Sequence, residues 1–153
     1  MLCDGFAVDG FNAAGFDAFL AGFSHNAAIG QRYRTHSPEW LELEIPFRPD
    51  LAGDFGGSSM ARGPIIALLD CAAGAAIWFS RKAVLPQVTI DLRVDFLRPV
   101  QEGAGIVGRG RCTRIAGSTA WVEAIGYEDD PANPACRAYG TYMLFKGEPM
   151  WQP

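Results

Sequence analysis

Residues 64–79 read PIIALLDCAAGAAIWF, and this stretch decides how the rest of the chain must be arranged. It predicts a helix that begins near Pro64, because proline is tolerated in the first helical turn. Asp70 is its single charged residue. A helix that is apolar on all sides is normally buried, so the fold must enclose this helix and must also compensate the charge of Asp70.

Asp70 is the candidate functional group of this helix. A buried carboxylate has to be paired, hydrogen-bonded or protonated, because removing a bare charge from water costs several kcal/mol or more. Perturbed acids of this kind are frequent at functional sites. Two interpretations follow from the residues alone: a structural carboxylate in a buried polar pocket, or a reactive group.

The bulk composition restricts the class of protein. The chain has 153 residues, 49% of them hydrophobic, and a formal net charge of −4, which predicts one acidic globular domain and argues against nucleic-acid binding. No C-x-x-C pair occurs, and the cysteines have no zinc-type spacing with His25 or His36, which we interpret as surface residues. We therefore expect no metal site, and free thiols in a reducing cytoplasm, for the cysteines at positions 3, 71, 112 and 136.

A membrane location is not expected. The apolar stretch is shorter than the roughly 20 residues that cross a bilayer. Asp70 near its middle would add roughly 3 kcal/mol to the free energy of insertion. The first residues also lack the basic and apolar regions of a signal peptide.

The rest of the chain divides into an N-terminal helical extension, residues 1–29, and a core, residues 30–146. Apolar spacing predicts a helix over residues 12–23. Alternating or apolar runs bounded by turn residues predict six strands. These strands cover residues 31–34, 40–47, 87–97, 104–115, 119–127 and 136–146.

Two strands alternate clearly enough to assign their faces. In residues 40–47, Glu42 and Glu44 alternate with apolar residues, so we expect them on the solvent side of a half-buried strand. In residues 87–97 the apolar residues occupy every second position and are expected on one face, with Thr89 on the other. Those apolar residues are Val88, Ile90, Leu92, Val94 and Phe96.

The last three strands carry small residues at every second position, and such residues share one face of a sheet. A face of glycine, alanine and cysteine leaves room for a bulky element to lie close against it. The apolar helix is the only such element. We therefore predict an α+β fold in which a curved antiparallel sheet wraps around one long central helix.

Two segments resemble the hotdog-fold acyl-CoA thioesterases of the phenylacetate-pathway and hydroxybenzoyl-CoA thioesterase type. Residues 62–72, RGPIIALLDCA, are similar to the family's helix start, in which His-Gly-Gly precedes Asp by six residues. Residues 88–99, VTIDLRVDFLRP, are also family-like, as is GRGR at 108–111 followed by a hairpin. The resemblance implies a single hotdog domain over residues 1–153.

The resemblance also implies an activity. It points to hydrolysis of a small or medium aryl- or alkyl-CoA thioester by a homodimer or homotetramer in the cytoplasm, with sites between subunits. Coenzyme A enters only as part of the substrate, and no metal or redox cofactor is implied. Asp70 takes the family's role of nucleophile or general base. The backbone N–H groups of Arg62 and Gly63 polarise the thioester carbonyl, and Thr89 of the neighbouring subunit orients the attacking water.

The same resemblance suggests residues that contact the rest of the substrate. Ala61 stands at the carbonyl pocket, in the place of the family's histidine, and Arg62 replaces the following glycine. The loop asparagine of the family has no counterpart near Phe55, where Asp54 or Ser58 would have to substitute. The remaining candidates are Arg98, Arg111 and Arg114 for the CoA phosphates, and Gly117 and Ser118 for the hairpin contact.

Two alternatives to hydrolysis stay open. The changes at Ala61 and Arg62 fit a protein that binds acyl-CoA or acyl groups without turnover. A hotdog hydratase or dehydratase would pair a carboxylate with a histidine, and the chain has no histidine after His36. The hydratase is therefore the less favoured of the two.

Overall fold

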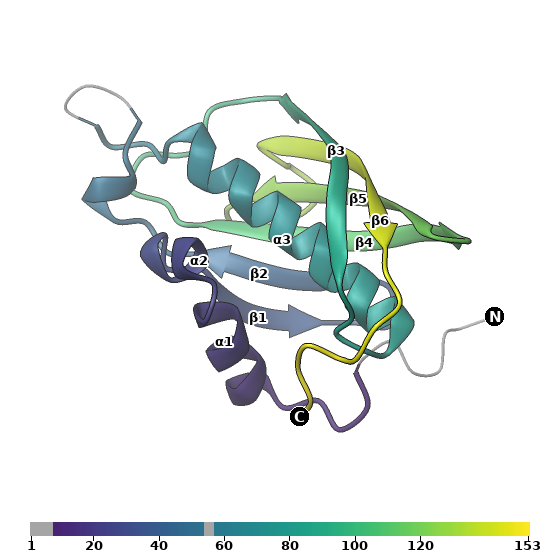
Figure 1. Ribbon diagram of the computed structural model, residues 1–153. Coiled ribbons are helices and arrows are strands. Elements are labelled where there is room, and N and C mark those ends of the chain that lie inside the picture. Colours follow the sequence, from purple (N-terminus) through teal and green to yellow (C-terminus); the bar gives the residue numbers. More distant parts are fainter. Residues whose placement is uncertain (1–7, 54–56) are drawn as a thin grey trace.

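The computed structural model describes residues 8–53 and 57–153, which form one six-stranded antiparallel sheet around a long helix (Figure 1). The helix, α3 (Arg62–Arg81), lies against the concave face of the sheet, so the predicted α+β arrangement is confirmed. The strand order is β1-β2-β4-β5-β6-β3. The strands are β1 (Arg32–His36), β2 (Leu41–Ile45), β3 (Gln87–Phe96), β4 (Ile106–Ala116), β5 (Thr119–Tyr127) and β6 (Cys136–Leu144).

Helix α3 is the core of the molecule and exceeds the predicted stretch by two residues at each end. It starts after Ala61, with no side chain capping its first N–H groups, and it ends at Lys82, which adopts a left-handed φ of 55°. By length and composition α3 would also suffice to cross a membrane. Here its apolar residues pack against the sheet instead, and from Ala72 to Phe79 every residue is buried.

The small residues of the sheet allow α3 to approach closely, as predicted. A Cβ atom at Gly108 would lie 2.8 Å from the Leu68 Cγ, and one at Gly110 would overlap the Ala72 carbonyl. Separations this short are sterically forbidden. Glycine is therefore required where β4 passes under the helix.

The N-terminal extension covers the β1 edge and the C-terminal end of α3. It consists of α1 (Ala13–Ala21), capped by the Asn12 side chain, and the short α2 (Ser24–Ala28), which the sequence did not predict. Phe16 of α1 packs edge-on against Phe79 of α3, and His36 of β1 joins them. His36 is half-buried in this contact, and burial lowers its pKa, whereas the sequence predicted a surface residue.

Strand β3 contains the irregularity that shapes the site. In its pairing with β6, Thr89 lies opposite Tyr142 and Asp91 lies opposite Thr141, so Ile90 is an extra residue, a β-bulge. The bulge reverses the alternation of the strand. Val88 and Ile90 are 51% and 55% exposed, contrary to the prediction that they share the buried face with Leu92. Thr89 turns toward α3 instead.

Candidate active site around Asp70

Asp70 lies in the middle of α3, half-buried beneath β3 and β6. Its Oδ1 atom accepts two hydrogen bonds, one from the Thr89 hydroxyl at 2.8 Å and one from the Tyr142 hydroxyl at 2.6 Å. Within the described residues no hydrogen bond or ion pair reaches Oδ2. The expected compensation of Asp70 is thus present, and two neutral hydroxyl groups supply it.

Tyr142 is a residue of this candidate site that the sequence analysis missed. It is 3% exposed and stands on the inner face of β6, in the same period-two series as Ala138 and Gly140. A large polar side chain in a series of small residues is the signal that identifies it. Burial raises the pKa of Tyr142 well above its ordinary value, and the negative charge of Asp70 adds to this effect.

Thr89 lies close to the Asp70 carboxylate, but to that of its own chain. The resemblance placed the hydroxyl of Thr89 in the neighbouring subunit, whereas the structure joins Thr89 to Asp70 of the same chain. The reason is the bulge at Ile90, which turns Thr89 inward where β3 crosses the helix (Figure 1). The next inward residue, Gln87, donates to the Gly74 carbonyl at 2.7 Å and fastens β3 to α3.

The start of α3 is the second part of the candidate site. Arg62 and Gly63 are both exposed, and a Cβ atom at Gly63 would meet no other atom within 4 Å. The Arg62 guanidinium lies 4.7 Å from the centre of the Phe96 ring. The side chains of Arg62 and Phe96 border a cavity of about 370 Å³, whose apolar walls include Met60 and Ile65.

The loop before α3 is only partly described. The backbone N–H of Ala61 donates to the Leu51 carbonyl at 2.8 Å, which fixes the residue that precedes the helix. Ala61 therefore has the expected position but brings no polar side chain. The Ser58 carbonyl accepts from the Gly103 N–H at 2.6 Å. Asp54 and Phe55 lie outside the described residues.

Arg98, a candidate for a CoA phosphate, is engaged by groups of its own chain. Its guanidinium donates to both carboxylate oxygens of Glu128, at 2.8 and 2.6 Å, and to the carbonyl groups of Pro99 and Asn133. The Glu128 side chain is only 4% exposed. These contacts fasten the end of β3 to the loop between β5 and β6, and the assignment of Arg98 to a CoA phosphate stays a prediction.

The other candidate CoA residues lie on the exposed hairpin between β4 and β5. Gly117 has a φ of 58°, as a tight turn requires, and the Ser118 carbonyl accepts from the Leu144 N–H at 2.8 Å. The Arg114 guanidinium lies 5.4 Å from the centre of the Trp121 ring. These three residues lie at the end of the sheet where Ala120 of β5 pairs with Tyr142 of β6.

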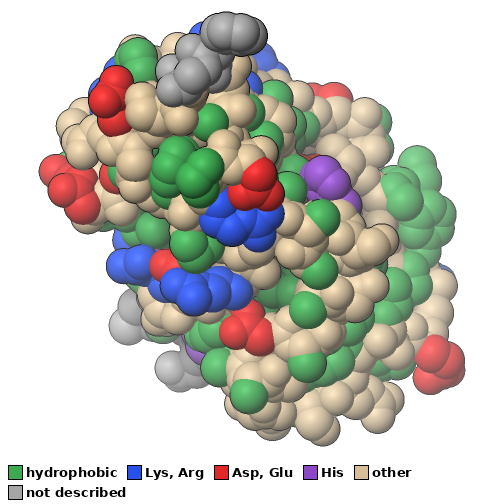
Figure 2. Space-filling model, turned by 90° about the vertical axis from the view of Figure 1, so that its left-hand side faces the viewer, with side chains coloured by type: hydrophobic (Ala, Val, Ile, Leu, Met, Phe, Trp, Pro, Cys, Tyr) green, Lys and Arg blue, Asp and Glu red, His purple; other side chains and the backbone are tan. Residues whose placement is uncertain are grey.

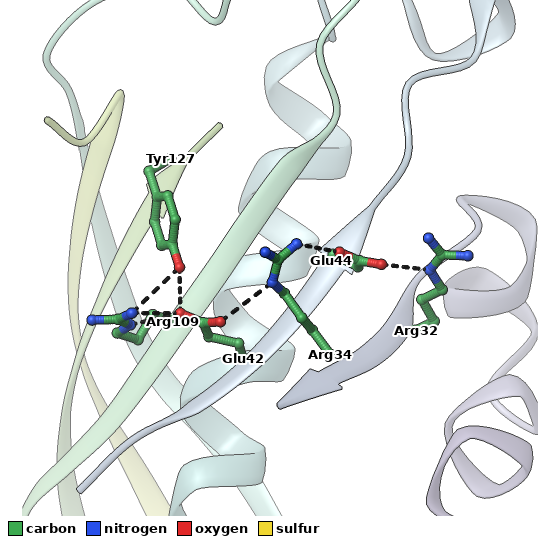
Figure 3. Close-up of polar contacts among 6 residues, drawn as sticks. All are labelled: Arg32, Arg34, Glu42, Glu44, Arg109 and Tyr127. Atoms are coloured by element: carbon green, nitrogen blue, oxygen red, sulfur yellow. Dashed lines mark hydrogen bonds and ion pairs between the residues drawn. The ribbon is translucent and has the colours of Figure 1, made fainter. Parts of the chain in front are cut away.

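A second carboxylate cluster lies on the convex face of the sheet (Figure 3). Glu42 is 3% exposed, not solvated as expected, because long side chains of neighbouring strands cover it. Arg109 donates to it at 2.7 Å, Arg34 approaches it at 3.5 Å, and Tyr127 donates a further hydrogen bond. Glu42 is thus held by positive charges, whereas Asp70 is held by neutral groups.

The charged surface shows no dominant sign on the face in Figure 2, which looks toward the start of α3: Lys and Arg side chains lie beside Asp and Glu side chains. In the part of the chain that the structure describes, no group of three or more His, Cys, Asp or Glu side chains is placed to hold a metal ion.

The Cys71 thiol next to Asp70 donates to Asn26 at 3.6 Å, and burial raises its pKa, as suits a packing residue.

Comparisons with known proteins agree with this architecture. The chain is 26% identical over 141 residues to the medium/long-chain acyl-CoA thioesterase YigI of Escherichia coli, covering 84% of this chain and 90% of YigI. A thioesterase of Haemophilus influenzae shares the fold with a TM-score of 0.77 at 16% identity, covering 88% of this chain and 91% of that one.

The PaaI protein of the Escherichia coli phenylacetic acid degradation operon has the same fold, with a TM-score of 0.73 at 16% identity, covering 88% of this chain and 93% of that one. The family model of the thioesterase superfamily matches residues 59–135, half of the chain, including α3 and the following strands to β5. The chain therefore belongs to the thioesterase superfamily, a family of thioester hydrolases with the hotdog fold.

Proposed function

We propose that the protein hydrolyses an acyl-CoA thioester and that Asp70 is the catalytic carboxylate. The observation that carries this proposal is the state of Asp70: its Oδ1 is held by Thr89 and Tyr142, while its Oδ2 has no partner among the described residues. A carboxylate fixed through one oxygen presents the other in a defined direction. That arrangement suits a general base or a nucleophile.

Either role gives a balanced reaction. As a general base, Oδ2 takes a proton from water while the water oxygen bonds to the thioester carbon. As a nucleophile, Oδ2 bonds to that carbon itself, and water later cleaves the resulting anhydride. In both routes the carbon–sulfur bond breaks, and the electron pair leaves with sulfur as the CoA thiolate. The chemistry requires no metal or redox cofactor.

The start of α3 supports stabilisation of the oxyanion. The N–H groups of Arg62 and Gly63 belong to the first turn, where the helix offers no backbone acceptor, and no side chain caps them. Pro64 follows and has no N–H group. The open space at Gly63 leaves room for a carbonyl group to approach. Two aligned donors at the positive end of a helix favour a developing negative charge.

One chain does not hold a complete site. Gly63 and Asp70 are separated by seven residues, which is about 10 Å along a helix at a rise of roughly 1.5 Å per residue. Oxyanion donors and the attacking atom must each lie roughly 3 Å from one carbonyl group. We infer that the helix start of one copy acts with Asp70 of another, as in the interface sites that the resemblance implies.

Strand β3 offers a surface for this pairing. It is the edge strand beside Asp70, so its outer backbone groups are free to join a second sheet. Val88 and Ile90 are more than half exposed at its start. Pairing through this edge would bury both residues and would bring two copies of α3 together at Asp70. The homodimer is the minimal assembly we propose, and a tetramer would contain two of them.

The substrate is assigned only by class. The cavity of about 370 Å³ beside Phe96 and Met60 has room and apolar surface for a small or medium aryl or alkyl group. The similarity to YigI, a medium/long-chain acyl-CoA thioesterase, favours alkyl chains. Arg114, Gly117 and Ser118 remain our candidates for contacts with CoA. We place the activity in the cytoplasm, where the free thiols at Cys71 and Cys136 would stay reduced.

A non-hydrolytic acyl-CoA binding protein is the second candidate. The observation that favours it is the apolar side chain of Ala61 just before the helix, beside the exposed Arg62. A carbonyl pocket without a side-chain donor at that position would bind a thioester and polarise it less strongly.

The test is release of free thiol from a series of aryl- and alkyl-CoA esters, with the wild type and Asp70→Asn measured side by side. We expect hydrolysis by the wild type and none above background by the variant. Hydrolysis that survives in Asp70→Asn would refute the assigned carboxylate. If the wild type releases no thiol, yet CoA esters raise its melting temperature, the binding protein is the correct function.

A further inference from the structure

Tyr142 makes contacts that the proposed function does not explain by itself. Its hydroxyl oxygen lies 2.6 Å from Asp70 Oδ1 and 2.7 Å from the backbone carbonyl oxygen of Asp70. Tyr142 is 3% exposed. A tyrosine that reaches two oxygen atoms of one residue is placed to control where that residue points.

The direction of the hydrogen bond follows from the chemistry of the hydroxyl group. A tyrosine hydroxyl has one hydrogen, and a charged carboxylate is a stronger acceptor than a peptide carbonyl. Burial raises the pKa of Tyr142, so the group keeps its proton at neutral pH. Tyr142 therefore donates to Oδ1 and cannot act as an acceptor of a proton from the reaction.

The bulge in β3 brings a second donor to the same atom. Because Ile90 is an extra residue, Thr89 lies opposite Tyr142 in the ladder and both side chains point toward α3. The Thr89 hydroxyl donates to Oδ1 at 2.8 Å. Two donors on one oxygen fix the rotation of the carboxylate about its last torsion, which is otherwise broad for aspartate.

We propose that Tyr142 is a positioning residue of the active site: with Thr89 it holds Asp70 Oδ1, and it thereby makes Oδ2 the atom that reacts with the thioester or with water. This inference rests on the proposed function, in which Asp70 is the catalytic carboxylate. It adds a residue that the similarity of the helix start does not identify, on a strand outside the matched residues 59–135.

The surroundings of the contact contain few other titratable groups. Asp70 itself and the Cys71 thiol, both on α3, are the titratable neighbours that act on Tyr142. Gln87 and Thr89, which face the contact from β3, are neutral. A change in pH behaviour upon loss of the Tyr142 hydroxyl would therefore report on Asp70, since Cys71 is buried and turned to Asn26.

The experiment compares Tyr142→Phe with Tyr139→Phe in the purified full-length protein. Tyr139 lies on the same strand and is 45% exposed, and its hydroxyl group makes no hydrogen bond among the residues that the structure describes. Both variants lose one hydroxyl group and keep the ring. We expect Tyr142→Phe to lower kcat about 10- to 100-fold, as suits loss of one hydrogen bond to a charged group. KM and the activity of Tyr139→Phe should remain near the wild-type values.

The pH profile supplies a readout that a purely structural role would not change. A carboxylate with one donor fewer is more basic, so the acid limb of kcat/KM should move to higher pH in Tyr142→Phe and stay in place in Tyr139→Phe. Thr89→Val, which removes the other donor, should move the limb in the same direction. An unchanged acid limb in both Tyr142→Phe and Thr89→Val would overturn the proposal.

A measurement independent of turnover separates this inference from the function. Infrared spectra are recorded on protein labelled with 13C-aspartate. Subtracting the spectrum of the equally labelled Asp70→Asn variant leaves the carboxylate band of Asp70. We expect this band to shift in Tyr142→Phe but not in Tyr139→Phe, and an unshifted band would refute the contact. A shifted band in a protein that hydrolyses no thioester would reject the proposed function and leave the contact in place.

Discussion

Two carboxylates of this protein, the half-buried Asp70 under the concave face of the sheet and the buried Glu42 on the convex face, are held in opposite ways. Glu42 is 3% exposed, and its contacts are with Arg109, Arg34 and Tyr127. Among the residues that the structure describes, Asp70 accepts side-chain hydrogen bonds from the hydroxyl groups of Thr89 and Tyr142 alone, both at the same oxygen. The charge of Glu42 is balanced by guanidinium groups, whereas the partners of Asp70 are neutral.

The difference indicates what each carboxylate can do. A carboxylate neutralised by guanidinium groups is a poor base and a poor nucleophile, but it ties strands together. A carboxylate compensated by neutral donors on one side retains a reactive oxygen on the other. The comparison therefore separates a structural acid from a catalytic one by the charge of their partners rather than by burial alone.

The largest effect we expect is on activity, at Asp70. Asp70→Asn keeps the size and both hydrogen-bond acceptor positions near Oδ1 but removes the charge, so kcat should fall about a thousand-fold, as expected for loss of a general base or nucleophile. The melting temperature should stay close to the wild-type value. Steady-state thiol release and calorimetry on the same sample measure both. A large loss of stability would show that Asp70 is structural after all.

Glu42→Gln should produce the reverse pattern. Removing one partner of a buried ion pair leaves the Arg109 charge uncompensated, and such changes cost about 3 kcal/mol or more. We expect the free energy of unfolding to fall by that amount in urea titrations. The kcat of the folded fraction should remain unchanged, because the convex face is remote from Asp70. A drop in kcat without a loss of stability would break the comparison.

Arg98→Met tests a second guanidinium-bound acid. The hydrogen bonds from Arg98 hold the pKa of Glu128 below its ordinary value, against the opposing effect of burial. A lowered pKa means that the pair stabilises the fold above about pH 4.5, and that this stabilisation is lost as the pH falls further. At neutral pH we expect the variant to lose about 2 kcal/mol of unfolding free energy.

The loss in Arg98→Met should shrink when the urea titration is repeated at progressively lower pH, because protonation of Glu128 removes the charge that Arg98 stabilises. KM for acyl-CoA esters should not change, since the guanidinium is already occupied by Glu128. A raised KM with unaltered stability would instead support the CoA role that the sequence suggested for Arg98.

The smallest effect we expect is on stability, at Tyr127, the tyrosine that donates to Glu42. Burial, followed by the hydrogen bond to Glu42, raises the pKa of Tyr127 to about 12, so Tyr127 donates at neutral pH as Tyr142 does. Tyr127→Phe should lower the free energy of unfolding by about 1 kcal/mol and leave kcat unchanged. Tyr142→Phe should mainly lower kcat. Equal effects of both variants on kcat would remove the distinction between the two acids.

Sequence reasoning was sufficient for the fold and for its main elements, α1, α3 and the six strands, but not for the short helix α2. The apolar run around Asp70, the alternation in β2 and the small residues of β4, β5 and β6 are local patterns, and the helix and the sheet around it follow from them. The strand over Thr119–Tyr127 was predicted with the observed bounds. The resemblance of residues 62–72 supplied the family, which the match over residues 59–135 confirms.

The environment of each acid depended on contacts between distant parts of the chain. The bulge at Ile90 is a property of the pairing of β3 with β6, so the sequence of β3 alone placed Thr89 on the wrong face. Glu42 is buried because Arg109 stands opposite it on β4, and Arg98 is occupied because Glu128 lies beside it.

The sequence by itself thus determined that one charged residue, Asp70, would lie in an enclosed helix. The continuous apolar run at residues 64–79 is a local property of the sequence, and a helix that is apolar on all sides is normally buried. Only the tertiary structure decided that Tyr142 and Thr89 would share its Oδ1, with no partner for Oδ2 in residues 8–53 and 57–153. Hydrogen bonds between side chains 19 and 72 residues apart depend on register and bulges, and these are set when the strands pair.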